Sequence, residues 1–264
     1  MSLHIQHVNK TFPRTRQGTA QHVLRDVNLT VNEGEFVSFI GHSGCGKSTL
    51  INVVAGLLSA DSGQVLLDGR PVTEPGPDRA VVFQSYSLLP RLSLLANVRV
   101  ATRSARPDRS REQNDEVVER YLNAVGLWEH RTKKPAQVSG GMQQRAAVAR
   151  AFAVGPKILL LDEPFGALDA LTRARLQQQL IDVWGQESDT ETVLMVTHGI
   201  EEAILLADRI VVMANAPQPS ILDVIDVGLA RPRDRVSVVD DPGFRAVQER
   251  LLALLTSEEQ KVAS

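Results

Sequence analysis

The sequence predicts an α/β fold with an antiparallel β subdomain before its core and a helical subdomain inserted into it. Short apolar runs of strand type alternate with segments of helical periodicity near both ends of the chain. Val27, Leu29 and Val31 alternate strictly with polar residues, as in a half-buried antiparallel strand. Between about residues 85 and 155 the strand patterns vanish and helical patterns replace them. The expected parts are a core at about 1–84 and 156–235, a helical subdomain at about 85–155, and a short C-terminal helical tail at 236–264.

The composition limits the classes of partner. The chain has 264 residues and a net charge of −2, so no global basic field attracts nucleic acid or anionic lipid. A single cysteine excludes an internal disulfide and a multi-cysteine metal site, which fits a reducing cytosol. No apolar run approaches the roughly 18 residues of a membrane span, and Met1–Thr30 has no signal-type apolar region. We expect a soluble chain that reaches a membrane only through a partner.

A glycine-rich loop lies between a predicted strand, Glu35–Ile40, and a predicted helix that continues from Leu50. Glycine, four residues and then Gly-Lys-Ser form the P-loop pattern. Its glycines let backbone N–H groups line an anion nest, and the helix N-terminus adds partial positive charge. Lys47 can reach β- and γ-phosphate oxygens, and the Ser48 hydroxyl suits Mg²⁺. The loop, a predicted nucleotide site, consists of Gly41, His42, Ser43, Gly44, Cys45, Gly46, Lys47, Ser48 and Thr49.

The side chains of His42 and Cys45 need no role of their own in this loop. The backbone binds the phosphates in a loop of this kind. We therefore expect both side chains to face solvent.

Two adjacent carboxylates close an apolar strand in the second half of the chain. Asp162 and Glu163 directly follow Ile158–Leu161, a fully apolar run. Carboxylates at the end of a buried strand are costly unless they serve a cation or a water molecule. Downstream of a P-loop this is the Walker B arrangement, in which Asp162 faces Mg²⁺ and Glu163 polarises the attacking water. The alternative is an exposed acidic pair that caps a helix.

Gln84 and His198 stand at the ends of two more predicted strands, 80–83 and 193–196. If these strands are parallel to the others, their carboxyl ends share one edge of the sheet with Asp162. Gln84 would then meet the metal or the water, and His198 would contact the γ-phosphate. Each residue also has an ordinary interpretation, Gln84 as a strand cap and His198 as a structural histidine.

A serine and two glycines precede an alanine-rich helical stretch. Ser139 suits an N-cap, and Gly140 and Gly141 allow the backbone to approach an anion closely. Taken alone, the three residues favour an ordinary capped helix start, because Ser-Gly-Gly is a common sequence.

In this order, the motifs resemble those of the ATP-binding subunits of ABC transporters. The resemblance extends over about residues 3–235 and implies a P-loop NTPase core of the ABC ATPase type, with a single ABC ATPase domain at 1–235. It implies ATP and Mg²⁺ as cofactors, and ATP hydrolysis coupled to solute translocation as the activity. The motifs are Gly41–Thr49, Gln84, Ser139–Gln143, Asp162–Glu163, Ala167–Asp169 and His198.

The resemblance also implies a catalytic set and a metal set. Glu163, His198 and Gln84 would take the catalytic roles. Ser48, Gln84 and Asp162 would hold Mg²⁺.

Further residues would bind ATP across a dimer. Phe12 would stack on adenine, and Asp169 would lie at the dimer seam. Ser139, Gly140 and Gly141 would form a signature that closes on ATP held by the P-loop of a second subunit. The resemblance thus implies a homodimer, or a pair with a related ATPase, that sandwiches two ATP molecules head to tail and reopens on hydrolysis.

Within the family, four segments are similar to an importer branch that serves nitrate, nitrite, cyanate, taurine and alkanesulfonates. His42 and Asn52 favour the nitrate or cyanate type. An ATPase subunit does not touch the solute, so these residues indicate kinship only. The segments are Gly76–Arg79, Val82–Gln84, Leu88–Pro90 and Asp162–Arg173.

The same resemblance implies the partners. A groove near Gln84–Val98 would receive the transmembrane permease subunits, and a periplasmic or extracellular solute-binding protein would act indirectly. The chain would lie peripherally on the cytoplasmic face of the inner membrane, and no nucleic acid is expected.

Three residues depart from the family pattern. Met142 replaces a more usual glutamine, and Arg91 stands where tryptophan is frequent. Gly199 replaces an aspartate after His198, which we expect to loosen the helix N-terminus that orients this histidine.

Two other functions fit less of the sequence. A soluble ABC-type ATPase acting on nucleic acid or ribosomes usually carries two fused cassettes, a long coiled coil or a basic arm, and none is visible. A P-loop kinase would need a lid over its acceptor substrate and would leave Ser139–Gly141 without a purpose.

Overall fold

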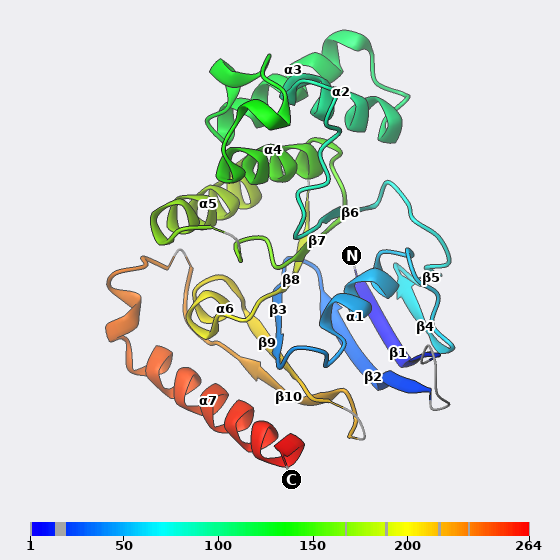
Figure 1. The fold of residues 1–264 in the computed structure, drawn as a ribbon, viewed down its shortest axis with the longest axis vertical. Helices are drawn as coiled ribbons and strands as arrows, with labels where there is room; N and C mark the ends of the chain where they lie inside the picture. The colour runs from blue at the N-terminus through cyan, green and yellow to red at the C-terminus, as the bar shows by residue number, and fades with distance from the viewer. Residues whose placement is uncertain are drawn as a thin grey trace. The chain divides into compact units, whose positions relative to one another are not determined.

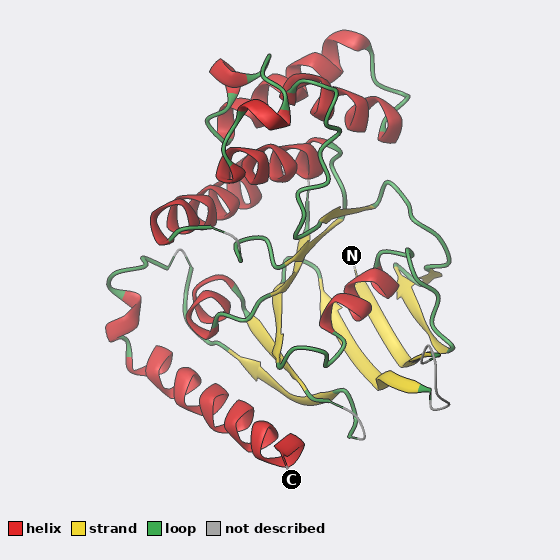
Figure 2. Cartoon of the chain, viewed as in Figure 1, coloured by secondary structure: helices red, strands yellow, loops and turns green. Residues whose placement is uncertain are grey.

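The computed structural model describes residues 2–13, 20–166, 168–187, 190–215, 218–231 and 233–263. The chain divides into two compact units, one formed by Met1–Pro75 with Thr192–Ser264 and the other by Gly76–Glu191 (Figure 1). Strands dominate the first unit and helices the second (Figure 2). Among the described residues, no helix combines the length and the hydropathy needed to span a bilayer.

The first unit contains an antiparallel sheet in the order β2-β1-β4-β5. Val27, Leu29 and Val31 of β2 are buried, which confirms the alternating strand predicted there. Asp68 and Gly69 join β4 to β5 with φ values of +50° and +74°, as a tight hairpin turn of the primed type requires. The strands are β1 (Ser2–Phe12), β2 (Gln21–Asn32), β4 (Ser62–Leu67) and β5 (Arg70–Pro71).

A second sheet carries the buried core of the same unit. β3 pairs in parallel with β8 on one side and β9 on the other, and β10 adds antiparallel to β9. Every residue of β3 and β8 is buried, which explains why both strands read as continuous apolar runs. α1 (Lys47–Val54) and α6 (Ile200–Leu206) both contact β3. The strands are β3 (Phe36–Gly41), β8 (Thr192–Val196), β9 (Arg209–Met213) and β10 (Ile221–Asp226).

The C-terminal helix is longer than the sequence predicts. The apolar pattern ends near Leu255, and we expect the last residues to fray, yet α7 runs from Pro242 to Ala263 and contacts α6 and β9 (Figure 1). Its backbone carbonyl at Leu255 accepts a hydrogen bond from the His42 side chain, and Glu258 beyond it is buried. Tertiary contacts therefore stabilise the helical turns near and beyond Leu255, whose composition alone does not predict an ordered helix.

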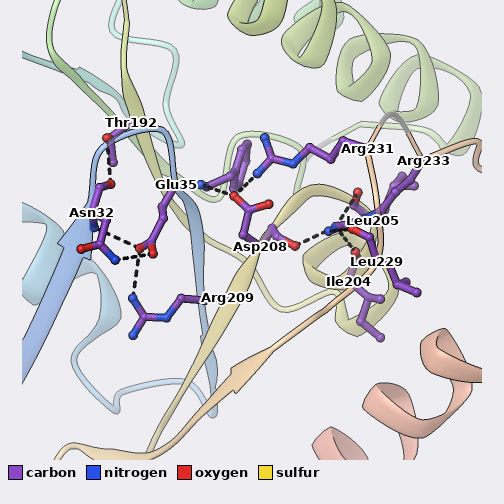
Figure 3. Close-up of polar contacts among 12 residues, drawn as sticks. Asn32, Glu35, Thr192, Ile204, Leu205, Asp208, Arg209, Leu229, Arg231 and Arg233 are labelled. Carbon is purple, nitrogen blue, oxygen red and sulfur yellow. Dashed lines mark hydrogen bonds and ion pairs between the residues drawn. The ribbon is translucent and has the colours of Figure 1, made fainter. Parts of the chain in front are cut away.

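A buried arginine closes the C-terminal end of α6 (Figure 3). The last carbonyl groups of a helix have no partner within the helix. Arg233 donates from Nη1 to the carbonyl oxygens of Ile204 and Ala207, both at 2.7 Å, and from Nη2 to that of Leu229 at 2.8 Å. The guanidinium thus ties the segment before α7 to the helix that follows β8.

The neighbouring Asp208 extends this connection to the first strand of the core. Its carboxylate accepts the backbone N–H of Phe36 at 2.8 Å and is paired with Arg231 (Figure 3). One carboxylate therefore anchors both the start of β3 and the chain that carries Arg233.

We expect Arg233→Met to lower the free energy of unfolding by about 2–3 kcal/mol, because it leaves buried carbonyl groups without their charged donor. Urea denaturation followed by far-UV circular dichroism measures the loss. Arg70→Met, on the exposed strand β5, is the matched control. Equal midpoints for the two variants would contradict a stabilising role for Arg233.

The second unit combines two parallel strands with a helical layer. β6 (Arg79–Val82) pairs with β7 (Ile158–Asp162). α2, α3 and α4 pack against one another, and α5 continues into a π-helical turn at Val183–Glu187. The helices are α2 (Leu94–Ala105), α3 (Arg111–Ala124), α4 (Gly140–Ala153) and α5 (Ala170–Asp182).

Serine caps explain where the three packed helices begin. Ser93, Ser110 and Ser139 each accept a backbone N–H from the third residue after them. The helices expected in this region are confirmed. In α2 the buried face is partly polar. Two of its four buried residues, Asn97 and Thr102, are polar, so its buried face does not show in a hydrophobic pattern.

Candidate nucleotide site

The loop between β3 and α1 has the backbone geometry of an anion nest. Gly44 and Gly46 have φ values of +86° and +99°, the left-handed region that favours glycine. A Cβ atom on Gly46 would lie 2.7 Å from the carbonyl oxygen of Val23, so a side chain has no room there. α1 begins directly afterwards at Lys47, and its N-terminal N–H groups point into the turn.

Lys47 is held within this loop. Its Nζ donates to the carbonyl oxygens of Gly41 at 2.8 Å and His42 at 3.0 Å, and the residue is only 5% exposed. The ammonium group is thus already positioned at the nest, and it can exchange carbonyl partners for phosphate oxygens of higher negative charge.

The structure corrects the expectation that Cys45 faces solvent. Cys45 is 1% exposed, and its Sγ lies 3.7 Å from Nζ of Lys47. A Cβ atom on Gly41 would come within 2.9 Å of this sulfur, so the thiol packs beneath the start of the loop. A small side chain that turns inward is what the tight loop can accommodate.

His42 is partly buried and is bound to α7. Its Nε2 lies 2.9 Å from the backbone oxygen of Leu255, and this oxygen can only accept, so Nε2 carries the proton. The two residues are 213 positions apart, so no local pattern could have predicted the contact.

Burial raises the pKa of the Cys45 thiol, and the nearby charge of Lys47 offsets the rise only in part. At neutral pH the group therefore stays a thiol. Because Cys45 is the only cysteine, alkylation of the whole protein reports on it alone. We expect iodoacetamide at pH 7.5 to modify it at least about tenfold more slowly than it modifies glutathione, with the rate rising above the usual thiol pKa of about 8.5. Intact mass measured against time gives the rate; labelling as fast as that of glutathione would contradict a buried, protonated thiol.

His198 stands at the same edge of the sheet as the nucleotide loop. β8 is parallel to β3, with Val196 opposite Phe39, and Thr197 donates its backbone N–H to the Phe39 oxygen at 3.1 Å. The carboxyl ends of the two strands therefore lie together, and His198 is exposed there.

Thr197 supplies the cap that Gly199 lacks. Gly199 is the N-cap of α6 and makes no side-chain cap bond. The Thr197 hydroxyl instead accepts the Gly199 N–H at 3.0 Å and donates to the Glu202 carboxylate in the first turn. The turn that carries His198 is thus held by a neighbouring hydroxyl.

Phe12 lies at the end of β1, partly exposed, with Nζ of Lys10 5.7 Å from the centre of its ring. β1 pairs with β2, the strand whose Val23 and Leu24 approach Gly46. The ring is therefore carried by the ribbon that touches the nucleotide loop.

In the second unit, Gln84 and Glu163 meet at the carboxyl ends of β6 and β7. Val82 is opposite Leu161, and Nε2 of Gln84 donates to Oε2 of Glu163 at 3.0 Å. Glu163 has a φ of +49°, a left-handed conformation that costs a residue with a side chain about 1–2 kcal/mol. Such strain persists only where the surroundings impose it, and it concentrates at functional sites. Asp162, the last residue of β7, is partly exposed beside this pair.

Ser139, Gly141 and Asp169 lie in the same part of the second unit. A Cβ atom on Gly141 would lie 2.6 Å from Cγ2 of Thr172 in the first turn of α5. Asp169 caps α5 by accepting the Thr172 N–H at 3.0 Å, and this hydrogen bonding holds the pKa of its carboxyl below the usual range. Ala167, from the predicted Ala-Leu-Asp motif, lies outside the described residues.

Two side chains of α4 bind the loops that follow β6 and β7. The sequence alone does not identify either of them as a functional residue. Gln144 donates to the carbonyl oxygen of Pro164, and Arg150 donates to that of Ser87 at 2.6 Å. A buried glutamine inside an alanine-rich helix is the one signal that could have indicated the first contact.

These features define a class of protein. A glycine-rich anion nest between a buried strand and a helix, a lysine held at the nest, and carboxylates at the end of a parallel strand are the parts of a P-loop nucleotide-binding protein.

Comparison with known proteins narrows the class. Residues 24–166 match the ABC transporter family. The chain is 50% identical to the nitrate import ATP-binding protein NrtD of Synechococcus elongatus, over 96% of this chain and 91% of the relative. It is 47% identical to the bicarbonate transport ATP-binding protein CmpD of Synechocystis, over 96% of this chain and 88% of the relative. The chain therefore belongs to the ABC transporter family and is one of its ATP-hydrolysing cassettes.

Solved structures agree with this assignment. The fold matches the ATP-binding cassette MJ0796, in a dimeric post-hydrolysis state bound to ADP and phosphate, with a TM-score of 0.73 and 32% identity. The match covers 85% of this chain and 98% of the other. A second dimeric structure of MJ0796 matches with a TM-score of 0.72. The predicted ABC ATPase fold is confirmed.

Proposed function

We propose that this chain powers an importer for a small anion, with nitrate or nitrite as the first solutes to test. The observation that carries the proposal is its 50% identity, over nearly the whole chain, to a nitrate import ATP-binding protein. The bicarbonate transport relative, at 47%, supports the wider class of small anions. The wider branch also includes cyanate, taurine and alkanesulfonate importers, which remain further candidates. No observation favours a soluble ATPase that acts on nucleic acid or ribosomes.

The proposed catalytic chemistry rests on Glu163. Its carboxylate accepts a proton from the attacking water as the water adds to the γ-phosphorus, and the β-phosphate oxygen leaves. The hydrogen bond from Gln84 at 3.0 Å orients this carboxylate. His198 contacts the γ-phosphate, and Lys47 neutralises charge on the β- and γ-phosphates.

The proposed metal ligands are Ser48, Gln84 and Asp162. Their hydroxyl, amide and carboxylate oxygens are hard donors of the kind that Mg²⁺ prefers, so the residues fit the ion in chemistry. When bound, Mg²⁺ would neutralise negative charge on the β- and γ-phosphates.

The remaining predicted contacts complete a shared site. Phe12 stacks on adenine, and Ser139, Gly140 and Gly141 close on ATP held by the P-loop of a second copy or of a related ATPase, with Asp169 at the seam. The dimeric forms of MJ0796 support this arrangement. The nest of that P-loop is formed by the backbone of residues 41–49.

We further propose the partners and the place of action. Transmembrane permease subunits bind near Gln84–Val98, and a solute-binding protein acts through them. The chain lies on the cytoplasmic face of the inner membrane. The ATPase domain extends over 1–235, with its helical subdomain at about 85–155 and a helical tail at 236–264.

Glu163→Gln tests the proposed chemistry and the shared site together. The variant keeps the shape of the side chain but loses the proton acceptor, so ATP binds without being hydrolysed. We expect a fall in turnover of at least about a hundredfold and dimers that form only with ATP. Light scattering after size exclusion, with and without ATP, measures the dimer.

The control for this experiment is Lys47→Ala, which should weaken ATP binding and remain monomeric in ATP. Normal turnover by Glu163→Gln would reject Glu163 as the base. A monomer with ATP bound would argue against a site shared by two copies of this chain.

His198→Ala should impair hydrolysis more than binding, because a contact to the γ-phosphate matters most as charge develops there. We expect kcat to fall by about 10²–10³-fold while the Kd for ATP changes by less than about fivefold. Steady-state kinetics and binding of a fluorescent ATP analogue measure the two quantities. Unchanged kcat would leave His198 a structural histidine.

A further inference from the structure

Gln144 lies where the signature helix meets the loop that carries Glu163. It stands in the second turn of α4 and is fully buried. Its Nε2 donates to the carbonyl oxygen of Pro164 at 2.6 Å. Pro164 directly follows Glu163, so the contact is one residue from the proposed base.

The N–H donor of the Gln144 amide, and not its oxygen, explains why a glutamine occupies this position. Oε1 of Gln144 is buried and has no hydrogen-bond partner among the residues that the structure describes. A buried acceptor without a partner is unfavourable, and an aliphatic side chain would avoid that cost at the same volume. The presence of an amide here is therefore explained by its N–H group, which donates to the carbonyl oxygen of Pro164.

The conformation of Glu163 depends on the direction of the next peptide. Glu163 is in the left-handed region, with a φ of +49°. The ring of Pro164 fixes its own φ, so a hydrogen bond that holds its carbonyl also restrains the peptide that leaves Glu163. Phe165, which follows, is buried and anchors the loop on the other side.

The same helix also supports the loop after Gln84. Arg150 donates to the carbonyl oxygen of Ser87 at 2.6 Å, where Tyr86 and Ser87 have φ values of +57° and +48°. At the start of the helix, a Cβ atom on Gly140 would lie 3.2 Å from the Tyr86 hydroxyl. α4 thus contacts both of the loops whose side chains, Gln84 and Glu163, hydrogen-bond to each other.

We propose that Gln144 is a positioning residue that couples the signature to the base. It lies five residues after Ser139, or about 7.5 Å along one rigid helix. A displacement of α4 when Ser139–Gly141 engage a nucleotide therefore reaches Pro164 through Nε2 of Gln144, and the carboxylate of Glu163 is aligned only when the signature is occupied. This inference rests on the proposed function, because it assumes that Glu163 is the base and that the signature binds ATP.

Gln144→Met is the direct test, since methionine nearly preserves the volume and removes the donor. We expect kcat to fall roughly ten- to a hundredfold, because small misplacements of a catalytic group have effects of that size, while KM and the Kd for ATP change less than about threefold. Gln177→Met is the matched control: it removes another buried glutamine of the same unit, on α5 instead of α4. The control should keep the parent kcat per bound nucleotide.

A double-mutant cycle separates positioning from a general loss of structure. If Gln144 acts through the Glu163 carboxylate, its substitution should have almost no further effect, less than about twofold, once Glu163→Gln has removed that carboxylate. Single-turnover hydrolysis of labelled ATP over hours measures the residual rates. Should Gln144→Met fail to fold, Gln144→Asn keeps an amide but withdraws it from Pro164, and the same results are expected.

The outcomes distinguish this inference from the proposed function. A parent-like kcat in Gln144→Met, or an equal proportional loss in both backgrounds, overturns the positioning role while Glu163 remains the base. Parent-like turnover in the single variant Glu163→Gln rejects Glu163 as the base in the proposed function, and the inference with it.

Discussion

The parallel hydrogen bonding of β3 between β8 and β9 is the constraint on which the first unit depends. The register places Val196 opposite Phe39 and Met213 opposite Gly41. A Cβ atom on Gly41 would lie 2.4 Å from the Met213 oxygen, so the nucleotide loop begins where its neighbour leaves no space for a side chain. The same register brings His198 to that edge. Loop and histidine are thus consequences of one strand pairing, and neither could move by a residue without the other.

In the second unit, helix α4 supports the loops that carry the proposed site residues, whereas strand pairing does so in the first unit. β6 and β7 place Gln84 and Glu163 at one edge, but both loops leave their strands through left-handed residues: Tyr86 and Ser87 after one strand, Glu163 after the other. Left-handed backbone with a side chain needs support from outside the loop. α4 gives it through Arg150 and Gln144. Among these left-handed residues, Glu163 is also the proposed base, as expected where function, and not local preference, sets the conformation.

Local chemistry explains what could be predicted from the sequence. The P-loop, the polar ends of the apolar strands and the serine-capped helices each follow from a short stretch of chain, and the fold class follows from their order. Contacts between distant segments could not be predicted. The burial of Cys45, the bond from His42 to Leu255 and the helical turns beyond Leu255 depend on residues far apart in the chain. The extent of α2 could not be predicted either, because polar residues, Asn97 and Thr102, occupy part of its buried face.

The division into two units has an optical consequence. Both tryptophans, Trp128 and Trp184, and both tyrosines, Tyr86 and Tyr121, belong to Gly76–Glu191. The unit that carries the P-loop has phenylalanines but neither tryptophan nor tyrosine. Ultraviolet absorbance near 280 nm and intrinsic emission therefore arise almost wholly from the unit that carries Glu163 and the signature. A change in intrinsic emission therefore reports on the helical unit. The unit with the P-loop contributes almost no emission, so a single introduced tryptophan would report on it independently.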